Sequence, residues 1–189
     1  MSRIPGHTID DAPEASRPFL KEMIRFSPTG QPLNLHAQMA HSPAVLAAYT
    51  SIRRATAEHR TLGQQVAAAL MLATAGAEGN DYALAITTRL ALNTGWPEDK
   101  VAALRTGETL GNPKIDALVN VTREAAAHAG HVSDTCWKAA KAAGWSDEHL
   151  TEAFAYLGLT LFTAYFLNYA ETELDLPTNP PAAQRERSG

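Results

Sequence analysis

Few side chains in this sequence have a type and spacing that suggest a reaction. Cys136 is the only cysteine among the 189 residues, which excludes an internal disulfide and a pair of redox thiols within one chain. It lies in a helical segment beside Trp137, and free cysteines of this kind are commonly buried. We therefore predict a structural Cys136, with an isolated reactive thiol as the alternative.

Four histidines are candidates for ligand or proton chemistry. His128 and His131 have a spacing found in metal sites, but Gly130 between them indicates a helix end, and no second ligand pair is near in sequence. We therefore expect no metal, and a metal-dependent protein is the weakest alternative. His36 and His41 lie at a helix boundary, where capping or packing is the commoner role, and each is also a candidate site residue.

A third group of polar residues opens a helix between Gly79 and Thr87. Asn80, Tyr82 and Thr87 could hydrogen-bond a small polar ligand, and Asp81 or Tyr82 could act as an acid or base. The structural alternative is that Asn80 or Asp81 caps the helix while the threonines face neighbouring helices. Both interpretations remain open on the sequence alone.

Helices must position these residues, because strand-like alternation is nearly absent and alanine-rich runs favour helix. A break is expected at Gly76 to Gly79, which makes the two flanking helices antiparallel neighbours. Apolar spacing and start and stop signals predict helical segments at 17–26, 34–41, 43–54, 62–75, 79–94, from 97 onward, 113–128, 133–143 and 146–171.

Residues 92–101 and 141–150 form a near-repeat. In each copy a glycine, Gly95 or Gly144, can end one helix in the left-handed conformation, a tryptophan follows, and acidic residues open the next helix. The near-repeat predicts two related helix-turn-helix units within one bundle.

The composition fits one globular domain, with 45% hydrophobic and 19% charged residues. A net charge of −4 without a basic stripe predicts no nucleic-acid partner. We find neither a signal-like apolar run nor about 20 consecutive apolar residues, so we expect a cytoplasmic protein outside the membrane. The aromatic-rich segment 153–170 predicts a core helix with excess surface that favours a homo-oligomer.

The order of these motifs resembles the carboxymuconolactone decarboxylase and alkylhydroperoxidase AhpD-like superfamily, in particular its peroxidase-related branch. The pieces that carry the resemblance are Asn34-Leu35-His36 through Leu46, the apolar run from Leu62, the turn within 91–104 and the closing segment 162–177. The resemblance implies an all-α, AhpD-like helical bundle with a helical-hairpin core in a single domain. It also implies a homo-oligomer, which could be a dimer, a trimer or a hexamer.

The resemblance also implies a division of the chain. Residues 1–33 would form an N-terminal arm and short helix, residues 34–177 the AhpD-like helical domain, and residues 178–189 a flexible tail.

In peroxidase members of this superfamily, two thiols one helical turn apart reduce a peroxide with the help of a histidine and a glutamate. Here the cysteine pair would fall on Asn80 and Ala83, the histidine on Thr87 and the glutamate on Ala68. All four family-equivalent positions are substituted, so the resemblance does not carry the thiol mechanism with it.

We therefore predict a small-molecule pocket or degenerate member without thiol peroxidase activity, with no cofactor and with a small organic ligand. Asn80, Tyr82, Thr87 and His41 are its predicted ligand-binding residues. The alternative is a peroxidase-related or decarboxylase-type enzyme with a non-thiol pocket, which requires His36 or His41 within hydrogen-bond reach of that pocket. Whether the chain is an enzyme is left open.

Overall fold

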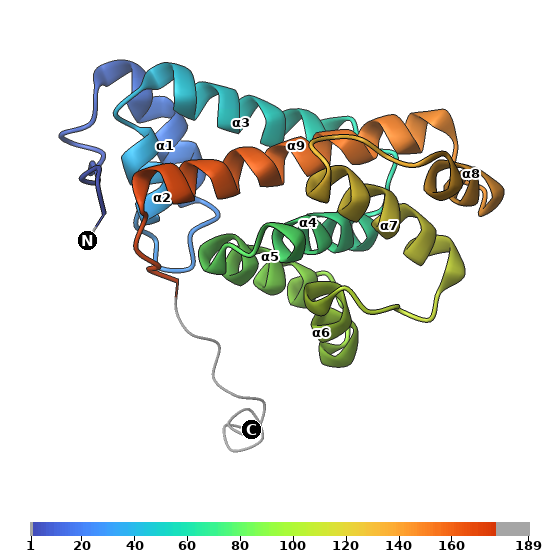
Figure 1. Cartoon of the computed structure of the whole chain (residues 1–189). Coiled ribbons are helices and arrows are strands. Elements are labelled where there is room, and N and C mark those ends of the chain that lie inside the picture. The colour runs from blue at the N-terminus through green and yellow to red at the C-terminus, as the bar shows by residue number, and fades with distance from the viewer. Residues whose placement is uncertain (1, 177–189) are drawn as a thin grey trace.

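The computed structural model describes residues 2–176, so Pro177 and the predicted tail at 178–189 lie outside the described residues. Within residues 2–176 the chain is all-α, as predicted (Figure 1). The elements are the 3-10 turn η1 (Glu14–Ser16) and the helices α1 (Arg17–Ile24), α2 (Asn34–Met39), α3 (Pro43–Glu58), α4 (Gln64–Glu78), α5 (Asp81–Asn93), α6 (Glu98–Thr106), α7 (Pro113–Ala127), α8 (Asp134–Ala142) and α9 (Asp147–Ala170).

Helix α4 is the centre of the bundle, because it is apolar on every side and must bury all its faces. Helices α5, α6, α7 and α9 all pack against it, and α3 lies along α9 (Figure 1). Leu70 and Leu72 in α4 are fully buried. The predicted central hairpin is therefore present, with α5 returning beside α4 after a short connection.

The break predicted at Gly76 to Gly79 is present but begins later than expected, because α4 continues through Gly76 to Glu78 and ends at Gly79, which has a φ of 65°. Gly76 instead lies where α4 crosses the end of α6. A Cβ built on Gly76 would be 2.7 Å from the carbonyl oxygen of Arg105. The missing side chain therefore permits a close approach of two helices and does not end one.

The predicted near-repeat corresponds to two units with the same closing contact. The first unit comprises α4, α5 and Trp96, and the second comprises α7, α8 and Trp145. The indole Nε1 of Trp96 donates to the carbonyl oxygen of Gln65 at 2.7 Å, and that of Trp145 donates to the carbonyl oxygen of Lys114, also at 2.7 Å. Each tryptophan thus joins the end of its unit to the first turn of the same unit.

Helix α9 begins at the Ser146 capping box and runs the length of the bundle. Among residues 2–176 it is the only helix long and apolar enough to span a membrane, and half of its most apolar stretch is buried inside the molecule. This burial agrees with the predicted core helix. Phe154, Tyr165 and Tyr169 remain more than half exposed on its outer side.

Candidate functional site

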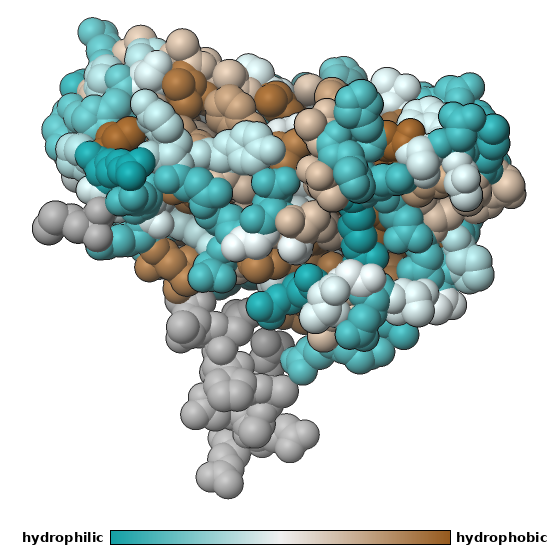
Figure 2. Space-filling view, in the orientation of Figure 1, coloured by the Kyte–Doolittle hydropathy of each residue, from teal (hydrophilic) through white to brown (hydrophobic). Residues whose placement is uncertain are grey.

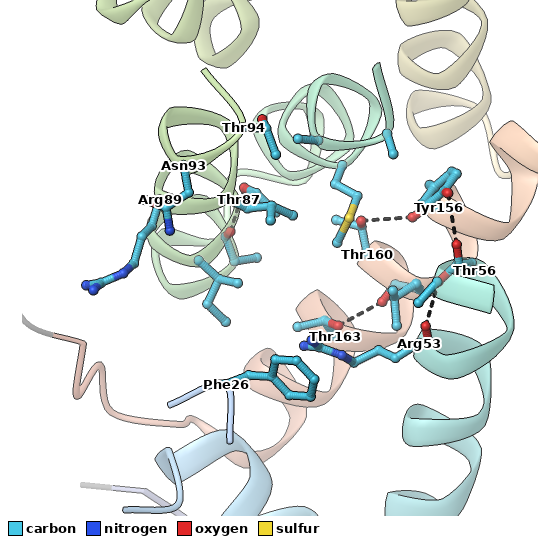
Figure 3. Close-up of a pocket in the computed structure, with 18 of the residues that line it drawn as sticks. Phe26, Arg53, Thr56, Thr87, Arg89, Asn93, Thr94, Tyr156, Thr160 and Thr163 are labelled. Atoms are coloured by element: carbon cyan, nitrogen blue, oxygen red, sulfur yellow. Dashed lines mark hydrogen bonds between the residues drawn. The ribbon is translucent and has the colours of Figure 1, made fainter. Parts of the chain in front are cut away.

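A cavity of about 540 Å³ lies between α3, α4, α5 and α9, beside the segment that connects α1 to α2 (Figure 3). Its lining residues are Phe26, Pro28, Leu33, His36, Tyr49, Arg53, Thr56, Ala57, Arg60, Gln64, Ala67, Ala68, Met71, Ala83, Ile86, Thr87, Arg89, Leu90, Asn93, Thr94, Tyr156, Leu159, Thr160, Thr163 and Leu176. The volume lies within the range of roughly 300–1,000 Å³ that is typical of small-molecule sites.

Small side chains create the space at the facing sides of α4 and α5. Ala67 and Ala68 come from α4, Ala83 comes from α5, and all three are buried. Met71, Ile86 and Leu159 extend this apolar lining. The cavity therefore favours a ligand with an apolar body.

The buried threonines of the cavity wall direct their hydroxyl protons to their own helices. The Oγ1 atoms of Thr87, Thr160 and Thr163 donate to the carbonyl oxygens four residues earlier, at 2.7, 2.9 and 2.7 Å. A hydroxyl has one proton, so these three side chains present methyl groups and lone pairs to the cavity but no free donor.

Donor groups are concentrated instead in a polar chain that begins on α3. Arg53 Nη1 donates to Tyr49 Oη at 3.3 Å, and Tyr49 Oη lies 3.3 Å from His36 Nε2. Residues 49 and 53 are one helical turn apart and share a face, whereas His36 comes from α2. This hydrogen-bonded chain joins the half-buried guanidinium of Arg53 to the His36 imidazole, which is only 4% exposed.

His36 is neutral at pH 7. Burial and, to a smaller extent, the positive charge of Arg53 lower its pKa to about 3. Arginine can only donate, so the Tyr49 oxygen accepts from Arg53, and its own proton is free to go to His36 Nε2. We assign the imidazole proton to Nδ1 on this basis. Nδ1 is buried and has no hydrogen-bond partner among the described residues.

Arg53 is held by aromatic rings and not by a carboxylate. Its guanidinium carbon lies 5.0 Å from the ring centre of Phe26 and 5.8 Å from that of Tyr49. Within residues 2–176 it forms no salt bridge, whereas its neighbour Arg54 pairs with Glu22 at 2.7 Å. The charge of Arg53 thus remains available at the cavity.

Of the four positions that the resemblance predicts to correspond to the family's catalytic residues, three line the cavity, namely Ala68, Ala83 and Thr87. The fourth, Asn80, caps α5: its Oδ1 accepts from the amide of Ala83 at 2.8 Å, and its Nδ2 donates to Asn168 Oδ1 at 2.5 Å. Asn80 therefore has the helix-capping role that was the alternative to ligand binding, and it is not among the lining residues.

Tyr82 and His41, also predicted as ligand-binding residues, do not line the cavity. Tyr82 is buried and donates to Asp175 Oδ1, and burial followed by this hydrogen bond raises its pKa. Asp175 Oδ2 also accepts from the amide of Asn34 at 2.8 Å. His41 is exposed and binds the N-terminal arm, with Nε2 2.9 Å from the carbonyl oxygen of Pro5.

Of the two histidines considered for a non-thiol site, His36 lies at the cavity and His41 does not. Tyr49 and Arg53 were not predicted as site residues, because the segment 43–54 was predicted only as a helix and no local pattern shows that it faces a cavity. The available signal was their spacing, since an aromatic and an arginine four residues apart share one helix face.

Cys136 lies outside the cavity, half-buried on α8. Burial, followed by a hydrogen bond to the Glu124 carboxylate and the charge of that carboxylate, raises its pKa to about 11. The thiol is therefore protonated at pH 7 and is a poor nucleophile. His128 Nδ1 is 2.9 Å from the carbonyl oxygen of Glu124, and no group of three or more potential metal ligands occurs among residues 2–176.

Similar solved structures share this architecture. Alkylhydroperoxidase AhpD core, an uncharacterized peroxidase-related protein from Ralstonia eutropha JMP134, has a TM-score of 0.80 at 15% identity, and the match covers 92% of each chain. A peroxidase-related protein from Silicibacter sp. TM1040 has a TM-score of 0.71 at 12% identity, over 93% of this chain and 95% of that one.

A further similar structure contains a ligand. A cysteine-to-alanine variant of the debrominase Bmp8 in complex with 2,3,4-tribromopyrrole has a TM-score of 0.77 at 16% identity, over 97% of this chain and 94% of that one. No family model matches the sequence, and a comparison with curated proteins finds no significant match. At these identities the structures show that the chain has the AhpD-like fold.

Proposed function

We propose that this AhpD-like protein binds a small organic molecule in the cavity between α3, α4, α5 and α9 and has no thiol peroxidase activity. The observation that carries the proposal is the lining itself: a largely apolar cavity of about 540 Å³ whose wall includes the buried residues Ala68, Ala83 and Thr87. The debrominase complex supports it, because a protein of this fold holds a small brominated ring.

The cavity makes a direct test of binding possible. Ala83→Leu adds volume inside the cavity, whereas Ala85→Leu adds the same groups on α5 at a position that does not line it. We expect only Ala83→Leu to weaken the binding of aromatic probes in isothermal titration calorimetry, with circular dichroism confirming that both variants fold. Equal binding by the wild type and Ala83→Leu would contradict a ligand site in this cavity.

The absence of thiol peroxidase activity has its own test. Peroxide consumption should equal the protein-free rate in the presence of excess dithiol, because the single thiol is protonated and has no partner in the chain. Turnover that persists after repurification and disappears in Cys136→Ser would overturn this part of the proposal.

A non-thiol enzyme is the second candidate, and the position of His36 at the cavity favours it. A neutral imidazole can accept a proton during a reaction. However, a pKa of about 3 makes His36 a weak base at pH 7, so we rank ligand binding above proton transfer. A pH–rate profile that depends on His36, measured with a ligand found by calorimetry, would reverse this order.

We also propose that the protein is a cytoplasmic homo-oligomer that assembles through the outer side of α9. Phe154, Tyr165 and Tyr169 are exposed there, and no charged residue occurs between Ala153 and Ala170. In the view of Figure 2, hydrophobic residues are mostly interspersed with hydrophilic ones. Light scattering should give a mass above 20.3 kDa that falls in Tyr165→Lys. A monomeric wild type would contradict this assembly.

A further inference from the structure

The cavity lining carries a one-sided charge. Arg53, Arg60 and Arg89 line it, and no aspartate or glutamate is present among its described lining residues. The chain as a whole has a net charge of −4, so the excess of arginine is a local feature and not a reflection of composition. A site walled by cations on a low-dielectric surface attracts anions.

The three arginines are not equivalent. In Figure 3 the guanidinium of Arg53 lies among the other labelled side chains, near Phe26 and Thr163, whereas Arg89 extends away from them. Arg53 is half-buried and Arg60 is exposed. Arg53 is therefore the cation best placed to contact a molecule inside the cavity, and the other two add positive potential at its edge.

Arg53 also lacks the partner that a half-buried arginine normally has. The rings of Phe26 and Tyr49 restrain its guanidinium, yet it donates one observed hydrogen bond, to Tyr49 Oη. Its remaining N–H groups have no acceptor among the described residues. A planar guanidinium with free N–H groups matches the two oxygens of a carboxylate.

The Glu152 carboxylate contacts the lining residue Tyr156 but is already engaged. Glu152 accepts from Tyr156 Oη at 3.0 Å, from the amide of Thr61 at 2.7 Å and from the amide of Leu62 at 3.1 Å. It is not a lining residue, so it does not neutralise Arg53 within the cavity.

His36 provides a second, independent indication. It lines the cavity, its buried Nδ1 atom has no partner among the described residues, and the tautomer assigned above makes that atom a donor. A buried donor without an acceptor is costly, so a ligand acceptor that reaches this atom would be favoured. The buried wall threonines, in contrast, have no free proton to offer a ligand. The unpaired polar groups of the site, on Arg53 and His36, are thus donors, and a ligand that pairs with them must carry an acceptor.

From these contacts we infer that the ligand is a small organic anion, an apolar ring or short chain bearing one carboxylate, with the carboxylate held at Arg53 on the side of His36. This inference rests on the proposed function and names its ligand class. The apolar body would lie against Ala67, Ala68 and Ala83, and the acidic group would replace the missing acceptor of the Arg53–Tyr49–His36 chain.

A matched pair of probes tests the inference on the whole protein. A naphthalene carboxylate and the corresponding neutral primary amide have nearly the same shape and differ in charge. Calorimetry at low and high salt should show the carboxylate binding about tenfold or more tightly than the amide, because a charge-assisted pair with arginine is worth roughly that ratio. The preference should shrink as salt rises.

A matched pair of variants tests the residue. Arg53→Gln should abolish the preference for the carboxylate while the affinity for the amide stays within about twofold. Arg54→Gln removes the same charge one position away, from a residue that does not line the cavity and that pairs with Glu22, and should leave the preference intact. Thermal melts establish that both variants remain folded.

The outcomes separate this inference from the proposed function. Equal affinity of the wild type for carboxylate and amide would overturn the anionic ligand while leaving the cavity as a small-molecule site. A preference that survives in Arg53→Gln would overturn the role of Arg53. If neither the wild type nor Ala83→Leu binds either probe, both proposals are contradicted.

Discussion

The first unit and the second unit end with the same backbone turn and tryptophan contact, but equivalent positions in the two units carry different residues. Gly95 and Gly144 have φ values of 91° and 89°, and the tryptophan after each one bonds a carbonyl oxygen 31 residues earlier. Nine residues before each tryptophan stand Thr87 in the first unit and Cys136 in the second. Equivalent backbone positions therefore carry the cavity wall in one unit and the single thiol in the other.

The repeated backbone gives both units the same frame, meaning the same helix ends and the same closing hydrogen bond. The helix that lies next to each unit then determines whether a cavity is left beside it. The first unit faces α3, which supplies Tyr49 and Arg53 and leaves a cavity above Ala68 and Ala83. In the second unit Cys136 packs against the hydrophobic core that both units share and contacts Glu124, so its surroundings suppress its reactivity. We therefore expect ligand binding at the first unit, where the packing leaves a cavity.

The largest expected effect tests whether the two frames are equivalent. Trp96→Ala and Trp145→Ala should each lower the free energy of unfolding by about 3–5 kcal/mol, because both indoles are nearly buried and each makes the closing hydrogen bond. Trp137→Ala removes a tryptophan that is 41% exposed and should cost much less. Denaturant unfolding measures all three, and a loss in only one unit would break the comparison.

The next effect tests a position at which the units differ. Gly76 and Ala125 each lie twenty residues before their tryptophan, and only the first unit has glycine there. Gly76→Ala should destabilise by up to about 3 kcal/mol, because the new Cβ would meet the Arg105 carbonyl oxygen at 2.7 Å. Gly158→Ala is the control, because a Cβ built on Gly158 would have no neighbouring atom within 4 Å. This variant should raise the free energy of unfolding by up to about 1 kcal/mol through its higher helix propensity. Equal results for the two variants would refute the close crossing.

Acid should affect the cavity side of the molecule through His36. Its folded pKa of about 3 lies below the ordinary value of 6.5, so below pH 6.5 the unfolded chain binds a proton that the folded chain does not. The stability from the neutral ring is present above pH 6.5 and is lost as pH falls toward 3. Between pH 7 and pH 5 the wild type should lose about 2 kcal/mol more than His36→Gln. Parallel curves from denaturant titrations would contradict the buried neutral imidazole.

Alkali should affect the second unit through Cys136. Glu124→Gln removes the nearby carboxylate charge, so the pKa of the thiol should fall from about 11 and alkylation at pH 8 should become several-fold faster. Asp134→Asn removes a charge on the same helix that pairs with Lys138 and should have a smaller effect. Iodoacetamide kinetics followed by mass spectrometry give both rates, and unchanged kinetics in Glu124→Gln would show that the carboxylate does not control the thiol.

The sequence was sufficient for the helices because their signals are local. The helix starts predicted at residues 43 and 113 coincide with the observed starts of α3 at Pro43 and α7 at Pro113. Gly76 misled because a close helix crossing depends on a residue far along the chain, Arg105, which no local pattern reveals.

The candidate site was predicted in part, for the same reason. Thr87, Ala83 and Ala68 line the cavity because helical spacing places them on one side of the hairpin. Asn80 and Tyr82 are close in sequence but turn to Asn168 and Asp175, partners that only the three-dimensional path of the chain after α5 could supply.

Asp175 links three parts of the chain at once, since it accepts from Tyr82 on α5 and from the amide of Asn34 at the start of α2, and its neighbour Leu176 lines the cavity. The same segment is held by further contacts, since Asn34 Nδ2 donates to the carbonyl oxygen of Glu173 at 2.9 Å and Leu176 packs against buried core residues. One part of the cavity wall therefore belongs to a segment that is tied to α2 and α5 by side chains and not by a helix of its own, so substitutions at Asp175 are expected to change how fast a ligand enters and leaves.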